Sequence, residues 1–211
     1  MIDLYTWSTP NGRKVSIMLE ECGLEYTVHK IDISKGEQFD PEFLKIAPNN
    51  RIPAIVDHDT GMSLFESGAI LMYLAEKTGK LWPQDLEGKW RTVEWLMWQM
   101  GGIGPMIGQA HHFIKNNKGK SPYSEERYLN ETKRLYGVLD RRLADNRFMA
   151  GEEYTIADIA TWPWISRFEW HTVDMNEFPN VVRWYKEIAA RPAVQRGYQV
   201  PIEQPDGIPM P

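Results

Sequence analysis

The chain has 211 residues, of which 42% are hydrophobic and 25% charged, and its formal net charge is −5. These values are typical of a globular protein with one large core or two small ones. No apolar run reaches about 18 residues, which argues against a membrane-spanning helix, and the negative charge argues against nucleic acid as the main partner. The single cysteine, Cys22, excludes an internal disulfide, so we expect a reducing, cytoplasmic setting.

The chain begins with a strand–helix–strand pattern. Alternating apolar residues predict a strand over residues 2–7, and turn-forming residues follow at 8–12. Apolar residues at helical spacing then predict a helix over residues 13–23, ending at a glycine. Residues 25–33 predict a second strand. Two strands joined by a helix predict a parallel pair with a right-handed crossover.

The next segment has a different order of elements. A short helix is expected over residues 41–46, with proline at its first position. A third strand over residues 52–57 is entered through a proline, and a turn leads into a fourth strand over residues 62–65 that runs back. An apolar helix over residues 67–77 completes the order βαβ, connecting helix, ββα.

The start of that last helix carries two polar residues, Glu66 and Ser67. Ser67 lies where an N-cap is expected, and a helix start exposes unpaired N–H groups and the positive end of the helix dipole. Such a place binds a carboxylate, while Glu66 offers an acceptor for an ammonium group. One turn can therefore hold both charges of an α-amino acid. The alternative is that Ser67 only caps the helix, and this stretch alone favours that interpretation.

The second half of the chain contains only helical patterns. We expect a first domain over residues 1–80, a linker over 81–87, an all-helical domain over 88–200 and an extended, proline-rich tail over 201–211. Asp158 closes a capping box that begins at Thr155, which predicts a structural role. His111 and His112 have no spaced carboxylate or second histidine pair beside them, so we expect packing and hydrogen bonding rather than a metal site. Cys22 lies on an apolar helix face and is expected to be a buried structural thiol.

The strand and helix order, with proline entering the third strand, resembles a thioredoxin-like domain. Together with the helical second half, the whole chain is similar to the cytosolic glutathione transferases, an α/β domain followed by an all-α domain. Finer motifs resemble the nu class, in particular the bacterial glutathione-dependent disulfide-bond oxidoreductases, with the fungal nitrogen-regulator prion protein as a more distant relative. The residues that carry these resemblances are 9–12, 48–57, 66–70, 101–106, 109–113 and 155–160.

The resemblance implies a glutathione site in the first domain. The bond before Pro53 is cis in this family, which leaves the backbone N–H and C=O of Ile52 to pair with the cysteinyl part of the ligand. Glu66 and Ser67 would hold the γ-glutamyl end, and Gln38 matches a contact to the glycyl end. For Pro53 the alternative is a rigid loop that enters a strand. Without the resemblance, Gln38 would be an ordinary loop residue.

A further contact is implied from the helical domain, where Arg127 matches a family position that contacts glutathione. A solvated helix charge is an equally good interpretation of this arginine.

The resemblance also implies the catalytic residues, Thr9 and Asn11. Thr9 stands at the position of the nucleophilic cysteine in a Cys-Pro-x-Cys motif. A helix start with hydroxyl and amide donors can stabilise a thiolate, but neither group is a nucleophile here. The reacting sulfur would come from glutathione, bound as one or two molecules or as its disulfide, with no metal. The alternative is that Thr9 and Asn11 only form the turn and cap at the helix start.

Two classes of function follow. The first is an enzyme that reduces small or mixed disulfides: a bound glutathione thiolate attacks the disulfide and a second glutathione resolves the product. Weak transferase or peroxidase activity on electrophilic substrates would accompany it. The second is a regulatory module that binds glutathione with little turnover. In both, the family implies a homodimer. The net charge and the lack of a long apolar run predict neither a nucleic acid nor a membrane partner.

Overall fold

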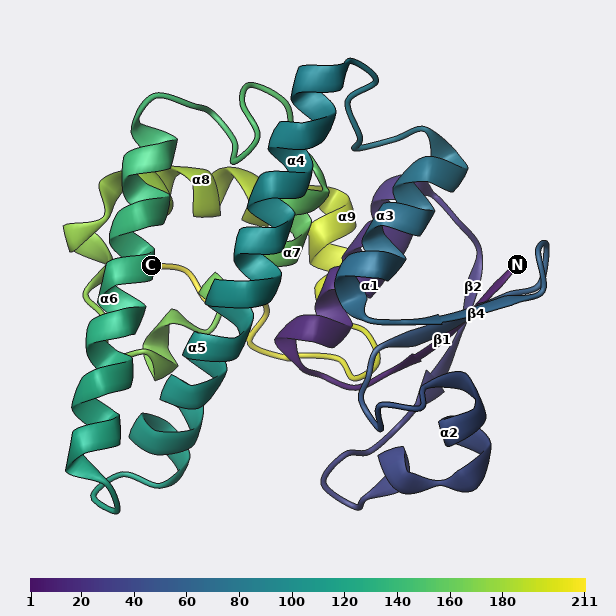
Figure 1. Ribbon diagram of the computed structural model, residues 1–211, viewed down its shortest axis with the longest axis horizontal. Helices are drawn as coiled ribbons and strands as arrows, with labels where there is room; N and C mark the ends of the chain where they lie inside the picture. Colours follow the sequence, from purple (N-terminus) through teal and green to yellow (C-terminus); the bar gives the residue numbers. More distant parts are fainter. The chain divides into compact units, whose positions relative to one another are not determined.

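The computed structural model describes residues 1–211 and divides them into two compact units (Figure 1). The N-terminal unit comprises Met1–Lys80 and Ala190–Ile208, and the helical unit comprises Leu81–Ala189 and Pro209–Pro211. None of the helices is both long enough and apolar enough to cross a membrane.

The N-terminal unit is built on a four-stranded sheet in the order β2-β1-β3-β4. The first strand pairs in parallel with the second and antiparallel with the third, and the third pairs antiparallel with the fourth. This is the mixed sheet that the βαβ and ββα patterns predict. The strands are β1 (Ile2–Thr6), β2 (Tyr26–Lys30), β3 (Ala54–Asp57) and β4 (Met62–Phe65).

Three helices of this unit lie close to the predicted segments, although the first begins at Pro10 and not at Arg13, and η1 and α9 were not predicted. Thr9 caps the first helix, and Gly23 ends it with a φ of 68° that favours glycine. The face of this helix that Val15, Met18 and Leu19 share is fully buried. The helices of the unit are α1 (Pro10–Cys22), η1 (Glu37–Phe39), α2 (Pro41–Ile46), α3 (Ser67–Thr78) and α9 (Pro192–Tyr198).

The division into units differs from the predicted domains at α9, which joins the N-terminal unit together with the chain as far as Ile208. The reason is its packing on α1. Gly197 lies so close that a Cβ there would be 2.7 Å from the backbone of Ile17, and the Ser16 hydroxyl donates a 2.7 Å hydrogen bond to the Gly197 carbonyl. The last helix and most of the proline-rich segment are therefore part of the thioredoxin-like unit.

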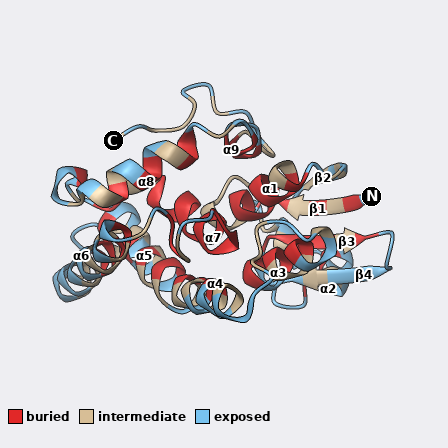
Figure 2. Ribbon diagram, turned by 90° about the horizontal axis from the view of Figure 1, so that it is seen from above, coloured by how far each residue is buried: buried red, intermediate tan, exposed pale blue.

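The helical unit contains no strand, as predicted, and its centre is α7, whose ten residues are all buried (Figure 2). Gly101 and Gly102 do not break the chain into separate helices, because a π-helical turn carries it from α4 into α5. The elements are α4 (Leu86–Trp98), η2 (Gln99–Ile103), α5 (Gly104–Ala110), η3 (His111–Asn116), α6 (Pro122–Ala144), α7 (Ile156–Ile165), η4 (Phe168–Trp170), η5 (Met175–Glu177) and α8 (Pro179–Ala189).

Asp158 organises the start of α7, and the predicted capping box with Thr155 is confirmed. Its carboxyl group is fully buried and accepts hydrogen bonds from the backbone N–H of Met149 at 2.9 Å, from that of Thr155 at 3.0 Å and from the indole of Trp184 at 2.8 Å. Burial raises the pKa of Asp158 to about 6, against the opposing effect of these donors. One side chain thus satisfies three buried donors from separate segments.

We expect Asp158→Ala to lower the free energy of unfolding by about 3 kcal/mol, because three buried donors lose their acceptor. For a chain of this size that is a fall of roughly 10 °C in the Tm. Thermal unfolding followed by circular dichroism measures it, with Asp145→Ala, an exposed carboxylate at the end of α6, as the matched control. Equal Tm values for the two variants would contradict the structural role of Asp158.

Candidate functional site

The turn between β4 and α3 is the first part of the site. Glu66 has a φ of 69°, in the left-handed region that non-glycine residues seldom adopt, and its carbonyl accepts the first helical hydrogen bond from Ile70 at 2.9 Å. Glu66 is therefore the N-cap residue, and Ser67 is the first residue of the helix. The prediction that Ser67 is the N-cap was wrong by one position, because the left-handed turn at Glu66 already redirects the chain.

No side chain caps α3. The N–H groups of Gly68 and Ala69 have no partner in the helix, so the positive end of the helix dipole is open to an anion. The Glu66 side chain is exposed beside them, and the amide of Asn49 lies 3.5 Å from its Oε1 atom. The turn thus offers donors for a carboxylate and a carboxylate for an ammonium group. This arrangement fits the α-amino acid end of a γ-glutamyl ligand.

Lys14 on α1 is a residue of this site that sequence reasoning missed. Its Nζ atom donates a 3.2 Å hydrogen bond to Ser67 Oγ, and both side chains are buried. Burial lowers the pKa of Lys14 to about 7, and the charge of Glu66 acts in the opposite direction. The available signal was its position one turn before Met18, on the helix face that packs inward.

The loop before β3 is the second part of the site. The Ile52–Pro53 bond is cis, as the family resemblance implied. Neither the N–H nor the C=O of Ile52 takes part in a backbone hydrogen bond, although the side chain is buried against Phe43 and Ala47. A buried side chain anchors the loop while its backbone groups remain available to an extended peptide, which can pair with them as an added strand edge.

The start of α1 is the third part of the site. The Thr9 Oγ1 atom accepts a 3.1 Å hydrogen bond from the N–H of Gly12, so the cap interpretation of Thr9 is confirmed. A capping hydroxyl uses only its oxygen as an acceptor, and its proton remains able to bond a sulfur atom. Asn11 is the second residue of the helix and is half-buried. Both polar groups therefore belong to the first turn of α1, where the helix dipole favours negative charge.

Gln38 lies in the short helix η1, and its Oε1 atom is buried without a hydrogen-bond partner. An unsatisfied buried acceptor costs stability unless a ligand or water supplies a donor. Its position is thus consistent with a ligand contact. Thr9, Asn11, Gln38, Ile52, Pro53, Glu66 and Ser67 all lie in the N-terminal unit.

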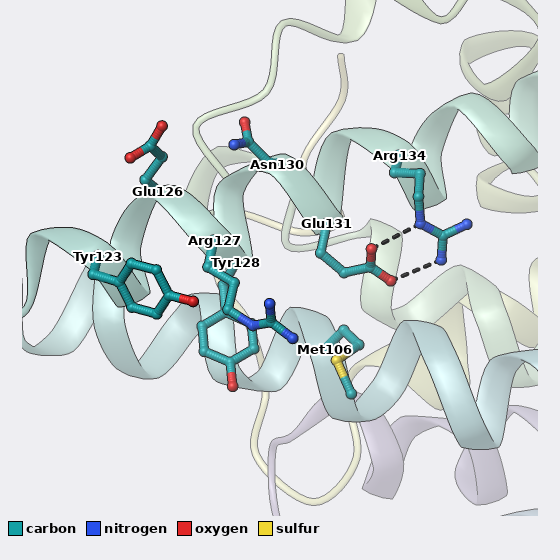
Figure 3. A pocket seen from close by; sticks show the side chains of 8 residues that line it. All are labelled: Met106, Tyr123, Glu126, Arg127, Tyr128, Asn130, Glu131 and Arg134. Carbon is teal, nitrogen blue, oxygen red and sulfur yellow. Dashed lines mark hydrogen bonds and ion pairs between the residues drawn. The ribbon is translucent and has the colours of Figure 1, made fainter.

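Arg127, the remaining predicted residue, lies in the helical unit on α6. It lines a hollow of about 610 Å³ with Met106, Tyr123 and Tyr128 (Figure 3). Arg134, on the same side, is paired through two hydrogen bonds of 2.7 Å with Glu131. Arg127 is exposed and forms no ion pair. Its guanidinium is therefore available for an anionic group entering this hollow.

The structure offers no reactive protein thiol and no metal cluster. The Cys22 Sγ atom lies 3.5 Å from Thr78 Oγ1, and burial raises the pKa of the thiol, so the predicted structural role is confirmed. No three His, Cys, Asp or Glu side chains are grouped to bind a metal ion. His111 instead forms a 2.9 Å hydrogen bond to His171 and stacks on Trp164, which confirms its packing role.

The sheet, the cis-proline loop and the open start of α3 define a thioredoxin-like domain with a site that fits a γ-glutamyl peptide. A helical unit follows it in the chain. Residues 1–76 match the N-terminal domain model of the glutathione S-transferases, and residues 103–192 match the C-terminal domain model. The chain belongs to the glutathione S-transferase family.

Two relatives show which members of the glutathione S-transferase family this chain resembles. The chain is 52% identical over 198 residues to the disulfide-bond oxidoreductase YfcG of Escherichia coli, with 92% of each chain covered. It is 36% identical over 227 residues to the transcriptional regulator URE2 of Saccharomyces cerevisiae, a match that covers 89% of this chain and 64% of the regulator. The resemblance to bacterial disulfide-bond oxidoreductases, and more distantly to the fungal regulator, is thus confirmed.

Two solved structures share the fold over nearly the whole chain. A glutathione transferase family member from Pseudomonas fluorescens, with two glutathiones bound, has a TM-score of 0.91 at 48% identity and covers 95% of this chain and 93% of its own. A glutathione transferase from Pseudomonas putida, with one glutathione disulfide bound per subunit, has a TM-score of 0.89 at 47% identity, covering 95% and 91%. The predicted fold, a thioredoxin-like domain followed by a helical transferase domain, is confirmed.

Proposed function

We propose that this protein is a glutathione-dependent disulfide-bond oxidoreductase that reduces small or mixed disulfides. The observation that carries the proposal is a site fitted to a γ-glutamyl peptide in a chain whose one cysteine is buried. The identity with the Escherichia coli disulfide-bond oxidoreductase supports the same reaction class. Transferase or peroxidase activity with electrophilic substrates is secondary in this proposal.

Each part of the tripeptide has a proposed partner. The α-carboxylate binds Ser67 and the open amides of α3, and the α-ammonium binds the carboxylate of Glu66. The cysteinyl backbone pairs with Ile52 beside Pro53, and the glycyl end receives Gln38. Support comes from the uncapped helix start and the unpaired backbone of Ile52. The buried Oε1 atom of Gln38, which has no partner, can accept a hydrogen bond from the glycyl N–H of the ligand.

Glutathione supplies the sulfur that exchanges with a substrate disulfide, a reaction that requires a thiolate and an aligned third sulfur. The chain supplies hydrogen-bond donors for that sulfur from Thr9 and Asn11, together with the dipole of α1. The relatives with two glutathiones or one glutathione disulfide bound support a site for two sulfur atoms in line. Arg127 is the proposed contact for an anionic group of the second molecule or of the substrate.

The assignment to the nu class and a cytoplasmic location belong to the same proposal. They are supported by the motif at residues 9–12 and by a single, reduced cysteine.

The alternative is a regulatory module that binds glutathione and turns over slowly. The match to the Saccharomyces cerevisiae regulator is the observation in its favour. The chain spans about two thirds of that regulator, so the properties of the whole regulator do not extend to this chain.

A steady-state assay separates the two functions. We expect clear turnover of the mixed disulfide of hydroxyethyl thiol and glutathione. Asn11→Ala should lower the rate about 10- to 100-fold, as expected for loss of one hydrogen bond to a developing thiolate. Cys22→Ala is the matched control and should retain the wild-type rate, because its thiol is buried away from exchange. Glutathione binding with no rate above the uncatalysed background would instead support the regulatory module.

We also propose that the protein is a homodimer. Helix α4 carries an unpartnered apolar stripe: Leu86 is 75% exposed, Trp90 63% and Met97 48%, and the three residues are spaced by whole helical turns. On strand β4, Met62 and Phe65 are also exposed. A second copy of this chain is the occupant that the family resemblance favours for such surfaces.

We expect light scattering to give twice the chain mass of 24.6 kDa. Trp90→Glu should shift the protein towards the monomer, because it places a charge in the middle of the stripe. Ile33→Glu, at an exposed apolar residue outside α4 and β4, should remain dimeric. A monomeric wild-type mass would contradict the proposal.

A further inference from the structure

Lys14 is the only lysine of α1 and is 1% exposed, which is unusual for an amine. Its hydrogen bond of 3.2 Å to Ser67 Oγ connects the second turn of α1 with the first turn of α3. Ser67 is itself 4% exposed and begins the helix whose first amides have no cap. Lys14 therefore lies directly behind the place where the α-carboxylate of a γ-glutamyl ligand is proposed to bind.

The surroundings of Lys14 bring the pKa of its amine close to neutral pH, so that the charged and neutral forms are both populated. Burial in a low-dielectric interior disfavours the ammonium form and lowers the pKa to about 7, while the charge of Glu66 partly restores it. The other charged side chains on α1 and on the elements packed against it have contacts elsewhere. These are Arg13 over Tyr198, Glu20 with Arg196, Glu21 with Arg191, Asp3 with His29 and His58, and Lys77 with Asp57 and Asp59. Glu76, also on α3, is exposed to solvent.

We propose, on the basis of the proposed glutathione site, that Lys14 is a proton-linked positioning residue for the ligand carboxylate. A carboxylate at the start of α3 draws a proton from solvent onto the Lys14 amine. The resulting ammonium donates a hydrogen bond to the Ser67 hydroxyl, which in turn donates to the ligand carboxylate. The positive charge of Lys14 then compensates the negative charge of that carboxylate. Glu66 holds the ligand ammonium at the same turn, so the chain presents one cation and one anion to a zwitterion.

This arrangement makes glutathione affinity depend on pH in a defined direction. A negative ligand raises the pKa of the Lys14 amine, so the ligand binds the protonated protein more tightly. Affinity is therefore greatest below about pH 7 and falls as the pH rises above it, by roughly ten-fold between pH 7 and 8.5. A purely structural lysine, present only to link α1 to α3, would give no such dependence.

Isothermal titration calorimetry tests the inference with S-methylglutathione, which lacks the thiol proton. Titrations at pH 7.5 in buffers of different ionisation enthalpy give the number of protons taken up per site. We expect wild type to take up about 0.7 proton, given an amine that is mostly neutral before binding. Lys14→Met should bind more weakly with no uptake, and Lys186→Met, an exposed lysine on α8, should behave as wild type.

A second variant, Lys14→Arg, distinguishes the loss of the titratable amine from a folding defect in Lys14→Met. Lys14→Arg keeps a permanent charge, so it should retain more affinity than Lys14→Met, with no proton uptake and no change in affinity between pH 7 and 8.5. Binding by wild type without proton uptake, or equal uptake by wild type and both Lys14 variants, would overturn this inference alone. No binding of S-methylglutathione by wild type would overturn the proposed glutathione site as well.

Discussion

The site depends on one backbone constraint, the left-handed conformation of Glu66 between β4 and α3. It ends the strand and starts the helix within a single residue, so the first amides of α3 have no capping side chain. A non-glycine residue at positive φ costs roughly 1 kcal/mol or more and persists only where the surrounding structure holds it. Here the hydrogen bond from Lys14 to Ser67 fixes the next residue. The strain sits where the ligand is proposed to bind.

The rest of the N-terminal unit supports this turn. The sheet positions β4, and α1 packs against α3, so the lysine beneath the turn comes from a rigid element. The close approach of Gly197 to Ile17 places α9 on the same helix, and ion pairs from Arg191 and Arg196 to glutamates of α1 reinforce the contact. A site that must hold a zwitterion needs its charges held in place, and packing rather than loop flexibility provides this.

Recognition of the γ-glutamyl group and reaction at the sulfur are proposed to take place at opposite ends of the site. In the proposed site, the turn at Glu66 selects the γ-glutamyl group and takes no part in the reaction at the sulfur. The start of α1 would set the reaction, because Thr9 and Asn11 can donate hydrogen bonds to a thiolate and cannot replace it as a nucleophile. A protein without an accessible thiol can then promote exchange between sulfur atoms that its ligands bring.

Much of this organisation was predictable from sequence because it rests on local patterns. Alternation and helical spacing predict the four strands, α2, α3 and most of α1, and the box from Thr155 to Asp158 predicts the start of α7. Non-local packing was not accessible: nothing in residues 192–198 indicates that they lie on α1. The role of Lys14 was missed for the same reason, since its hydrogen-bond partner Ser67 is 53 residues away. The π-helical turn at Gly101 depends on how α4 and α5 pack, which periodicity does not report.

Glutathione is proposed to bind with its γ-glutamyl group at the start of α3 and its cysteinyl sulfur directed to the start of α1. A crystal structure of the protein with glutathione disulfide measures this most directly. We expect the α-carboxylate on Ser67 and the amides of α3, the cysteinyl backbone paired with Ile52, and a sulfur atom within hydrogen-bond reach of Asn11 or Thr9. A tripeptide bound away from Glu66 and Ser67, or a sulfur directed away from α1, would contradict it.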